Sequence, residues 1–262
     1  MNLPEEILVA AVLAVVFAAL AWALEHYWGL LGLVRSLLPT SLWRRRSRIR
    51  VSMAAILRVN VGDDYVLSRL AARPDAFGPF GGVYHSFESA DDVLDRFEFR
   101  AVSTQPNPRD LRGFVPRHRL AEVVHWFQSG RDRETAEECL VRELREELVE
   151  THADALLPAV EHLRFRHIRT VYEPPRKVPG RDYEQFRCFH VYELDHASAP
   201  SRAFVQALMT EAATNPDLLI ATSAEIVVGR TSRSLVAHHA EYLFSSSASR
   251  PDLPQPDFER LK

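Results

Sequence analysis

The chain opens with an uninterrupted apolar run, and the rest alternates between apolar and polar positions. Residues 7–24 read ILVAAVLAVVFAALAWAL and contain no charged side chain. As a helix, this run would extend about 27 Å, close to the thickness of the bilayer hydrocarbon. Acidic rather than basic residues precede it, and no small-residue cleavage site follows it. The pattern therefore predicts a retained transmembrane helix rather than a cleaved signal peptide.

The charges on either side of this run predict its orientation. The segment WRRRSRIR, residues 43–50, is strongly basic, whereas the short N-terminal tail carries Glu5 and Glu6. The positive-inside rule then places the N-terminus outside and the remainder in the cytoplasm. A second apolar stretch, Tyr27–Leu38, is too short to span alone, although a second span stays open. We expect residues 1–50 to form a single-pass anchor in the lipid bilayer with a basic juxtamembrane segment.

After residue 50 the pattern becomes that of a mixed α/β domain. Strands are predicted where β-branched and aromatic residues concentrate, and helices where apolar residues recur every three or four positions. The predicted strands are 52–60 and 64–70, joined by a VGDD turn, together with 97–103, 162–172, 182–194 and the short 224–229. The predicted helices are 117–128, 202–214 and 232–244. The Ser- and Pro-rich residues 245–262 predict a disordered tail.

Charge and cysteine content narrow the functional classes. The formal net charge is −3. The chain has no overall excess of basic residues, so we do not expect a duplex nucleic acid partner. The two cysteines, Cys139 and Cys188, match no zinc-binding spacing and predict free thiols in a reducing compartment.

The segment ECLVRELREELVE, residues 138–150, concentrates glutamates on a predicted helix. Thr135 followed by Glu138 forms a capping-box pattern that predicts the helix start. Like charges four residues apart, as in Glu143 with Glu147, each destabilise a helix by about 0.2–0.5 kcal/mol. A divalent cation would reverse that sign because hard cations bind several carboxylate oxygens. Helix chemistry alone leaves a solvated surface helix and a metal site both open.

The spacing around this helix resembles the Nudix box, G-x5-E-x7-R-E-U-x-E-E-x-G-U, where U is aliphatic. The matching residues are Glu134, Arg142, Glu143, Leu144, Glu146 and Glu147. The resemblance implies a Mg²⁺ or Mn²⁺ site made by Glu143, Glu146 and Glu147, with Glu134 supporting it more loosely. Arg142 would orient the carboxylates, and the catalytic set would be Arg142, Glu143, Glu146 and Glu147.

Two positions depart from the box. Glycine is expected at positions 128 and 149, where the chain has Gln128 and Val149. A glycine pair, Gly81 and Gly82, stands instead in GPFGGVYH, followed by an insertion at about residues 85–130. We therefore expect a split box within a Nudix-like α/β/α sandwich with a mixed sheet, covering residues 51–244.

The whole arrangement, including DLRGFVP and RETAEECLVRELREEL, resembles the SMODS-associated Nudix domains of CD-NTase-associated proteins. These occur in bacterial cyclic-oligonucleotide anti-phage signalling (CBASS). The resemblance implies an effector in the bacterial inner membrane that binds a nucleotide or cyclic oligonucleotide, with homo-oligomerisation left open. The alternative is an active metal-dependent Nudix hydrolase that cleaves a nucleoside diphosphate derivative. A membrane scaffold that binds protein is a third reading.

Further candidate residues lie outside the box. The loop EPPRKVPGR offers Arg176, Lys177 and Arg181, which with Gly81 and Gly82 are the candidate nucleotide-binding residues. Guanidinium and ammonium groups bind phosphate well, but a solvated hairpin loop explains the same residues. Glu225 stands where Nudix enzymes can place an additional catalytic glutamate, or it is an ordinary exposed residue.

Overall fold

The computed structural model describes residues 47–102 and 107–250. The predicted anchor, residues 7–24, the second apolar stretch, residues 27–38, and residues 43–46 of the basic segment lie outside the described residues. Among those described, no helix combines the length and the apolar character needed to cross a membrane. Membrane anchoring therefore stays a prediction.

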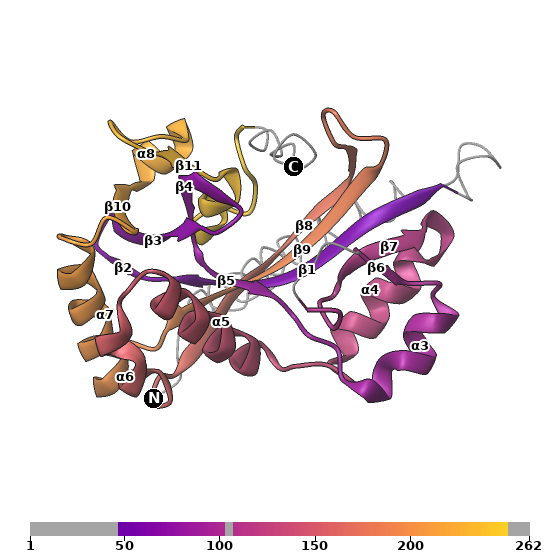
Figure 1. Cartoon of the computed structure of the whole chain (residues 1–262), viewed down its shortest axis with the longest axis horizontal. Helices are drawn as coiled ribbons and strands as arrows, with labels where there is room; N and C mark the ends of the chain where they lie inside the picture. The colour runs from indigo at the N-terminus through magenta and orange to yellow at the C-terminus, as the bar shows by residue number, and fades with distance from the viewer. Residues whose placement is uncertain (1–46, 103–106, 251–262) are drawn as a thin grey trace, which may run out of the picture.

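Two mixed sheets form the frame of the described part of the chain (Figure 1). The first has the order β6-β7-β1-β9-β8 with β5 beside β1, and the second has the order β10-β3-β4-β11 with β2 beside β3. The strands are β1 (Arg48–Arg58), β2 (Asn60–Val61), β3 (Asp64–Leu70), β4 (Arg73–Gly78), β5 (Phe80–Val83), β6 (Arg100–Ala101), β7 (Arg112–Pro116), β8 (Phe165–Lys177), β9 (Glu184–Leu194), β10 (Leu218–Thr222) and β11 (Leu235–Val236). The mixed α/β architecture agrees with the predicted Nudix-like fold, although the sequence predicted a single sheet.

Strand β1 lies at the centre of the molecule and contributes to both hydrophobic cores. Val51, Met53 and Ala55 belong to one core, whereas Ala54 and Ile56 belong to the other. Successive side chains of a strand point to opposite faces of the sheet. Because both faces of the second half of β1 are covered, residues 53–57 form a continuous apolar run, whereas residues 48–52 alternate between polar and apolar.

A hairpin forms at the predicted turn, but it joins β3 to the short strand β2 and not to β1. Val61 of β2 pairs with Asp64 of β3, and Gly62, with φ of +60°, makes the turn. Strand β1 itself pairs with β5, β7 and β9 in the other sheet. The prediction that residues 52–60 pair with 64–70 was therefore wrong for all but the last residues of the first segment. The chain crosses between the sheets at Val59, which is buried.

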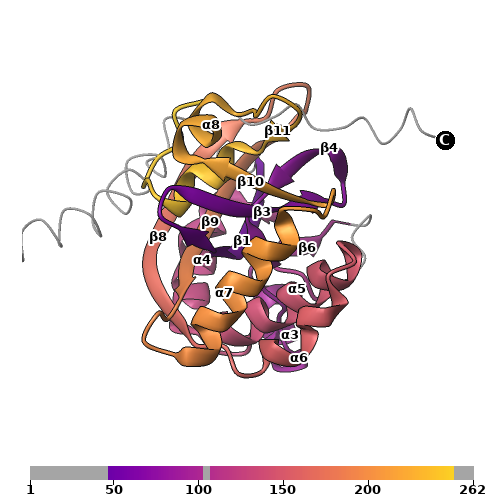
Figure 2. The ribbon, with the colours of Figure 1, turned by 90° about the vertical axis from the view of Figure 1, so that its left-hand side faces the viewer.

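The helices fill the spaces around the two sheets (Figure 2). The α-helices are α3 (Asp91–Arg96), α4 (Leu120–Ser129), α5 (Ala136–Glu150), α6 (Leu157–Val160), α7 (Ala199–Ala212) and α8 (Ser223–Val228). The 3₁₀ helices are η1 (Glu88–Ala90), η2 (Arg117–Arg119), η3 (Asp154–Leu156) and η4 (His238–Leu243). The predicted helices 117–128 and 202–214 are confirmed as α4 and α7. Helix α5 is also confirmed, with the Thr135–Glu138 capping box formed and Leu140, Leu144 and Leu148 buried.

Three local predictions were wrong. Residues 224–228 lie in α8 and Gly229 caps its end, because Thr222 and Glu225 form a reciprocal capping box that begins a helix instead of a strand. Residues 232–244 form β11 followed by η4 rather than one α-helix, since Leu235 and Val236 pair with β4. Of the predicted strand 97–103, the described residues 97–102 form only the two-residue strand β6.

The C-terminal end of the described chain is held against the core. Ser249 donates hydrogen bonds from its backbone N–H and its hydroxyl to the buried Glu241, at 2.8 and 3.0 Å. Arg250 donates to the carbonyl oxygens of Ile226 and Val236, at 3.2 and 2.7 Å. The sequence predicted disorder from residue 245. The structure instead describes residues 245–250, whose end is hydrogen-bonded to η4, α8 and β11.

A buried ion network joins the first sheet to η4. Glu173 of β8 accepts hydrogen bonds from Arg187 of β9 and from Tyr242 of η4, and His238 Nε2 lies 3.0 Å from its carboxylate. Burial alone would raise the pKa of Glu173, but these partners outweigh it and hold the pKa at about 2. The carboxylate is therefore stabilised in the folded state relative to the unfolded chain.

This network predicts an acid-sensitive contribution to stability. An acid whose folded pKa is depressed adds stability above its unfolded pKa of 4.5 and loses it as the pH falls towards 2. The contribution is on the order of 3 kcal/mol. We expect Glu173→Gln to lower the free energy of unfolding at pH 7 and to flatten its pH dependence between pH 4.5 and 2, as measured by denaturant titration. Glu122→Gln, which breaks an exposed ion pair with Arg119, should change both by less than about 1 kcal/mol.

Candidate functional site

The acidic helix and the glycine pair are distant in sequence but lie in contact. Helix α5 packs against β5, and the backbone N–H of Gly81 donates to Glu147 Oε2 at 2.9 Å. A Cβ atom on Gly82 would overlap the carboxylate of Glu143. Gly81 has φ of +116°, which side chains rarely adopt, and a Cβ there would overlap the carbonyl oxygen of Ala55. Gly81 is thus required by its backbone conformation and by the close approach of β1, whereas Gly82 leaves space for the carboxylate of Glu143.

The split in the box is closed by the backbone. Ser86 and Arg133 form an antiparallel bridge, and the N–H of Glu134 donates to the carbonyl of His85 at 3.0 Å. The insertion between them, residues 86–133, leaves and returns at one point and carries α3, β6, β7 and α4, which group together in Figure 1. The sequence placed it at about 85–130. Gly82 and Glu134 are consequently neighbours in space, as a continuous box would make them.

The two positions that depart from the box pattern lie away from the contact between α5 and β5. Gln128 lies on α4 within the insertion, where it is exposed and donates to the hydroxyl of Tyr172 at 2.5 Å. Val149 lies near the end of α5 and is 50% exposed. Neither position lies at the junction of α5 with the glycine pair.

Glu134 and Arg142 form the supporting part of the site. Arg142 donates from Nε to Glu134 Oε1 at 2.8 Å and from Nη2 to Oε2 at 3.0 Å. The backbone N–H of His85 also donates to Oε2, at 2.9 Å. Burial alone would raise the pKa of Glu134, but these hydrogen bonds outweigh it and hold the pKa below its usual range. Because both carboxylate oxygens are engaged, Glu134 is suited to orienting Arg142 rather than to binding a metal directly.

Arg142 also contacts the next two carboxylates along the helix, those of Glu143 and Glu146. Its Nη1 donates to Glu143 Oε1 at 2.7 Å and lies 3.6 Å from Glu146 Oε1. Its Nη2 donates to the carbonyl of Val83 on β5 at 2.9 Å. The guanidinium group therefore fixes Glu143 against the strand that carries the glycine pair.

Two of the glutamates are desolvated, and the third is open to solvent. Burial raises the pKa of Glu143 despite its contact with Arg142. Burial raises the pKa of Glu147 well above its usual range, opposed by the Gly81 N–H and increased further by the charge of Glu143. Glu146 is exposed over 57% of its side chain. Strong shifts caused by burial and like charge are typical of functional sites.

The carboxylates of α5 are donors of the chemical type that divalent cations bind. Among the described residues, no three acidic, His or Cys side chains are already close enough to hold a metal. Glu143, Glu146 and Glu147 nonetheless present oxygen donors on neighbouring turns of one helix, and hard cations such as Mg²⁺ and Mn²⁺ prefer oxygen donors. A cation would also relieve the repulsion between Glu143 and Glu147. Nudix domains in general use such metals.

The structure does not bring the basic loop to this face. Arg176 and Lys177 pair with Gln185 and Glu184 at the far end of the β8–β9 hairpin, and Lys177 forms an ion pair with Asp182 at 3.2 Å. Arg181 lies in the connecting turn. Glu184 is opposite Ile49 of β1, whereas Gly81 is opposite Ile56, so the two groups are separated by roughly 20 Å along the strand. Glu225 is engaged in the capping box of α8.

The site also contains residues that the sequence did not single out. Ser68 of β3 donates from its hydroxyl to Glu147 Oε1 at 3.1 Å. His85 lies beside Glu134 and contacts Asp110, and Arg112 interacts electrostatically with Asp110 and Glu143. These residues come from separate segments, and no spacing pattern in the sequence indicates that they meet.

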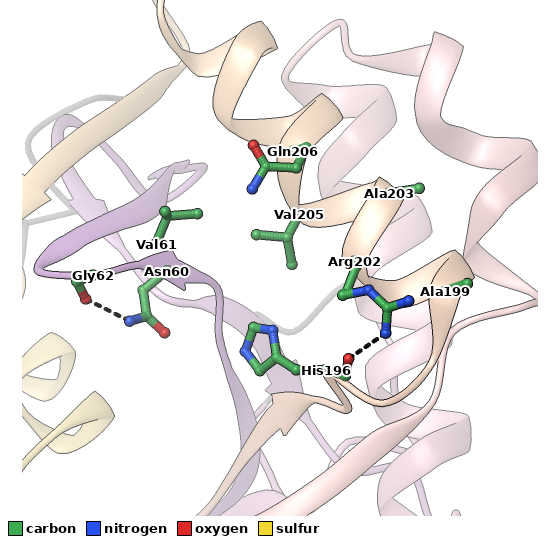
Figure 3. Close-up of a pocket in the computed structure, with 9 residues that line it drawn as sticks. All are labelled: Asn60, Val61, Gly62, His196, Ala199, Arg202, Ala203, Val205 and Gln206. Carbon is green, nitrogen blue, oxygen red and sulfur yellow. Dashed lines mark hydrogen bonds between the residues drawn. The ribbon is translucent and has the colours of Figure 1, made fainter.

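A groove lies between α7 and the β2–β3 turn (Figure 3). It has a volume of about 640 Å³, and Val205 and Val61 contribute apolar surface to it. Arg202 donates to the backbone carbonyls of His196 and Ala197, at 2.6 and 3.0 Å. Of the described residues that line the groove, none is a predicted site residue, so we place the functional site on α5 and β5.

Comparison with known families identifies the family to which the chain belongs. The family model of the SMODS-associated NUDIX domain matches residues 48–244, which include β1, the glycine pair, the insertion, α5 and η4. A search of curated proteins gives no match. The match extends over more than half of the chain, and the chain therefore belongs to the family of SMODS-associated NUDIX domains.

Proposed function

We propose that this protein is a membrane-anchored effector of bacterial cyclic-oligonucleotide anti-phage signalling, and that its Nudix domain binds a nucleotide at the acidic face of α5. The observation that carries the proposal is the pair Glu143 and Glu147, two desolvated carboxylates with raised pKa values directly over Gly81 and Gly82. Such an arrangement stores electrostatic repulsion that a divalent cation relieves. A cation held there would attract the phosphates of a nucleotide.

The residues of the box divide this task between them. Glu143, Glu146 and Glu147 would hold Mg²⁺ or Mn²⁺, while Glu134 and Arg142 fix the orientation of Glu143. The metal, when bound, would supply positive charge to the phosphate oxygens. Gly81 and Gly82 lack side chains at the strand surface, which lets the helix carboxylates approach the backbone.

The membrane part of the proposal rests on the sequence. The apolar run at residues 7–24 and the basic segment at 43–50 support a single-pass anchor in the inner membrane with the N-terminus outside. The basic segment leads directly into β1, so the Nudix domain would follow the membrane surface closely on the cytoplasmic side. A ligand-dependent change in oligomeric state is one way for such a domain to act on its anchor.

A second candidate function is hydrolysis of a nucleoside diphosphate derivative. It is favoured by the full set of glutamates and Arg142, which the fold gathers at one helix and strand despite the insertion. Attack of water on a pyrophosphate requires a group that accepts its proton, and Glu146 is the box carboxylate most open to solvent. Positioning and electrostatics supply most of the remaining catalysis in phosphoryl chemistry.

One experiment tests both candidates. The full-length chain, purified in detergent, would be incubated with Mn²⁺ and a panel of cyclic di- and trinucleotides and nucleoside diphosphate derivatives, and the mixture analysed by mass spectrometry. For the receptor, we expect one ligand to be retained intact in a Mn²⁺-dependent manner. Cleavage that disappears in Glu146→Gln would establish the hydrolase instead. If no nucleotide is retained or cleaved, the proposed function is wrong.

A further inference from the structure

We propose that His85, held by Asp110 of the insertion, is a positioning residue for the metal site, so that the insertion is an integral part of that site. The inference rests on the proposed function, because it takes the acidic face of α5 to be a metal site. It goes beyond the box in assigning a role to two residues that the box pattern does not contain.

The contact begins with His85, which directly precedes the insertion, and Asp110 within it. His85 Nε2 lies 3.0 Å from Asp110 Oδ1, and both side chains are mostly buried, with 17% and 13% of their surface exposed. The backbones of the same two residues form an antiparallel bridge. The side-chain amide nitrogen of Asn107 lies 3.1 Å from His85 Nε2 and 3.3 Å from Nδ1. The insertion therefore fixes the imidazole ring through both main chain and side chain.

His85 in turn contacts Glu134 from two directions. Its backbone N–H donates to Glu134 Oε2 at 2.9 Å, and its ring Nδ1 lies 3.6 Å from Oε1. Arg142 contacts the same two oxygens from the side of the helix. Glu134 is thus clamped between His85 and Arg142, and a shift of the imidazole would be passed on to the guanidinium group that orients Glu143.

The charges around Asp110 are consistent with a positioning role. Burial raises the pKa of Asp110 even though Arg112 and His85 oppose the shift. Burial lowers the pKa of Arg112, which interacts with both Asp110 and Glu143. Burying charged groups costs several kcal/mol per ion before their mutual attraction is counted. An insertion that served only to cover apolar surface would not require this partly buried polar contact beside Glu134.

The test measures metal affinity rather than activity. Mn²⁺ binding to the full-length chain would be followed by the electron paramagnetic resonance signal of free Mn²⁺, for the wild type, Asp110→Asn, His85→Leu and His85→Gln. Loss of a residue that orients metal ligands typically weakens affinity about 10–100-fold. We expect at least about a 10-fold loss in Asp110→Asn and His85→Leu, and a smaller loss in His85→Gln, which retains a polar group beside Asp110.

A matched control lies in the same insertion. Asp91→Asn breaks an exposed ion pair with Arg109 and should leave Mn²⁺ affinity unchanged. Melting curves identify any variant that has lost its fold. If Asp110→Asn is such a variant, the Mn²⁺ affinities of His85→Gln and His85→Leu are compared instead. Folded variants that bind Mn²⁺ as tightly as the wild type overturn the inference and leave the proposed function standing. A wild-type chain that binds no Mn²⁺ overturns both.

Discussion

Glu147→Gln is expected to raise the melting temperature of the metal-free protein and to abolish its stabilisation by Mn²⁺. Desolvation raises the pKa of Glu147 well above its usual range, so above pH 4.5 the desolvated carboxyl lowers the stability of the metal-free folded protein relative to the unfolded chain. The amide can still accept from the Gly81 N–H and bond to the Ser68 hydroxyl. Each kcal/mol gained raises the melting temperature of a domain of this size by about 2–4 °C.

The raised pKa of Glu147 also determines how the stability of the metal-free protein changes with pH. An acid whose folded pKa is raised binds more protons in the folded state, so the stability of the metal-free wild type falls as the pH rises from 4.5 through that raised pKa. The variant should lack this fall. Mn²⁺ at 100 times its dissociation constant should stabilise the wild type by about 2.7 kcal/mol and the variant not at all.

Glu150→Gln is the control for this experiment. Glu150 is an exposed carboxylate at the end of the same helix, and its charge raises the pKa of Glu147 less than burial and Glu143 do, so its replacement should change the metal-free melting temperature and the Mn²⁺ response far less than Glu147→Gln does. A Glu147→Gln protein that is still stabilised by Mn²⁺ would show that Glu147 does not hold the metal.

Gly81→Ala and Gly82→Ala are expected to have large but different effects. At Gly81 the new Cβ would meet the backbone carbonyl of Ala55 at φ of +116°, so stability should fall by on the order of 3 kcal/mol or more. At Gly82 the Cβ would meet only the end of the Glu143 side chain, which can move away. The protein should therefore stay folded while Glu143 is displaced and Mn²⁺ affinity falls.

Thermal melting and Mn²⁺ titration of the two variants separate these outcomes. Gly180→Ala provides the backbone control, because Gly180 has φ of +74° but no atom within 4 Å of its ideal Cβ. It should cost only about 1–2 kcal/mol from the backbone conformation. Unchanged Mn²⁺ affinity in Gly82→Ala would contradict the placement of Glu143 in the site.

The acidic helix was predictable because its signals are local. The Thr135–Glu138 capping box and the leucines four residues apart specify both the start of α5 and its buried face, and the structure contains both. The partition of the chain into two sheets was not predictable in this way. An apolar run such as β1 indicates a buried strand, but its pairing with β9 depends on contacts more than a hundred residues away.

The error at α8 illustrates competition between two local signals. Ile226, Val227 and Val228 are β-branched and favour a strand, whereas Thr222 and Glu225 favour a helix start. The capping box, which was present in the sequence as T-x-x-E, determines the outcome. The same pattern had been used correctly at α5.

The candidate site was predictable in its glutamates and not in its surroundings. Glu143, Glu146 and Glu147 lie on one helix, so their spacing is visible in the sequence. The sequence also singles out Gly81 and Gly82, which the structure places against this helix. The contacts of His85 with Asp110 and of Ser68 with Glu147 arise only when the insertion closes and β3 packs nearby. The basic loop was grouped with the nucleotide site by its chemistry, but the long β8–β9 hairpin places it at the other end of β1.

The central claim, that the acidic face of α5 is a divalent-metal site, is tested most directly by anomalous X-ray scattering from crystals of the full-length protein soaked with Mn²⁺. We expect an anomalous peak within bonding distance of the carboxylates of Glu143 and Glu147, above Gly81 and Gly82, and its absence in crystals of Glu147→Gln. A peak only at other residues, or none at all in the wild type, would contradict the account.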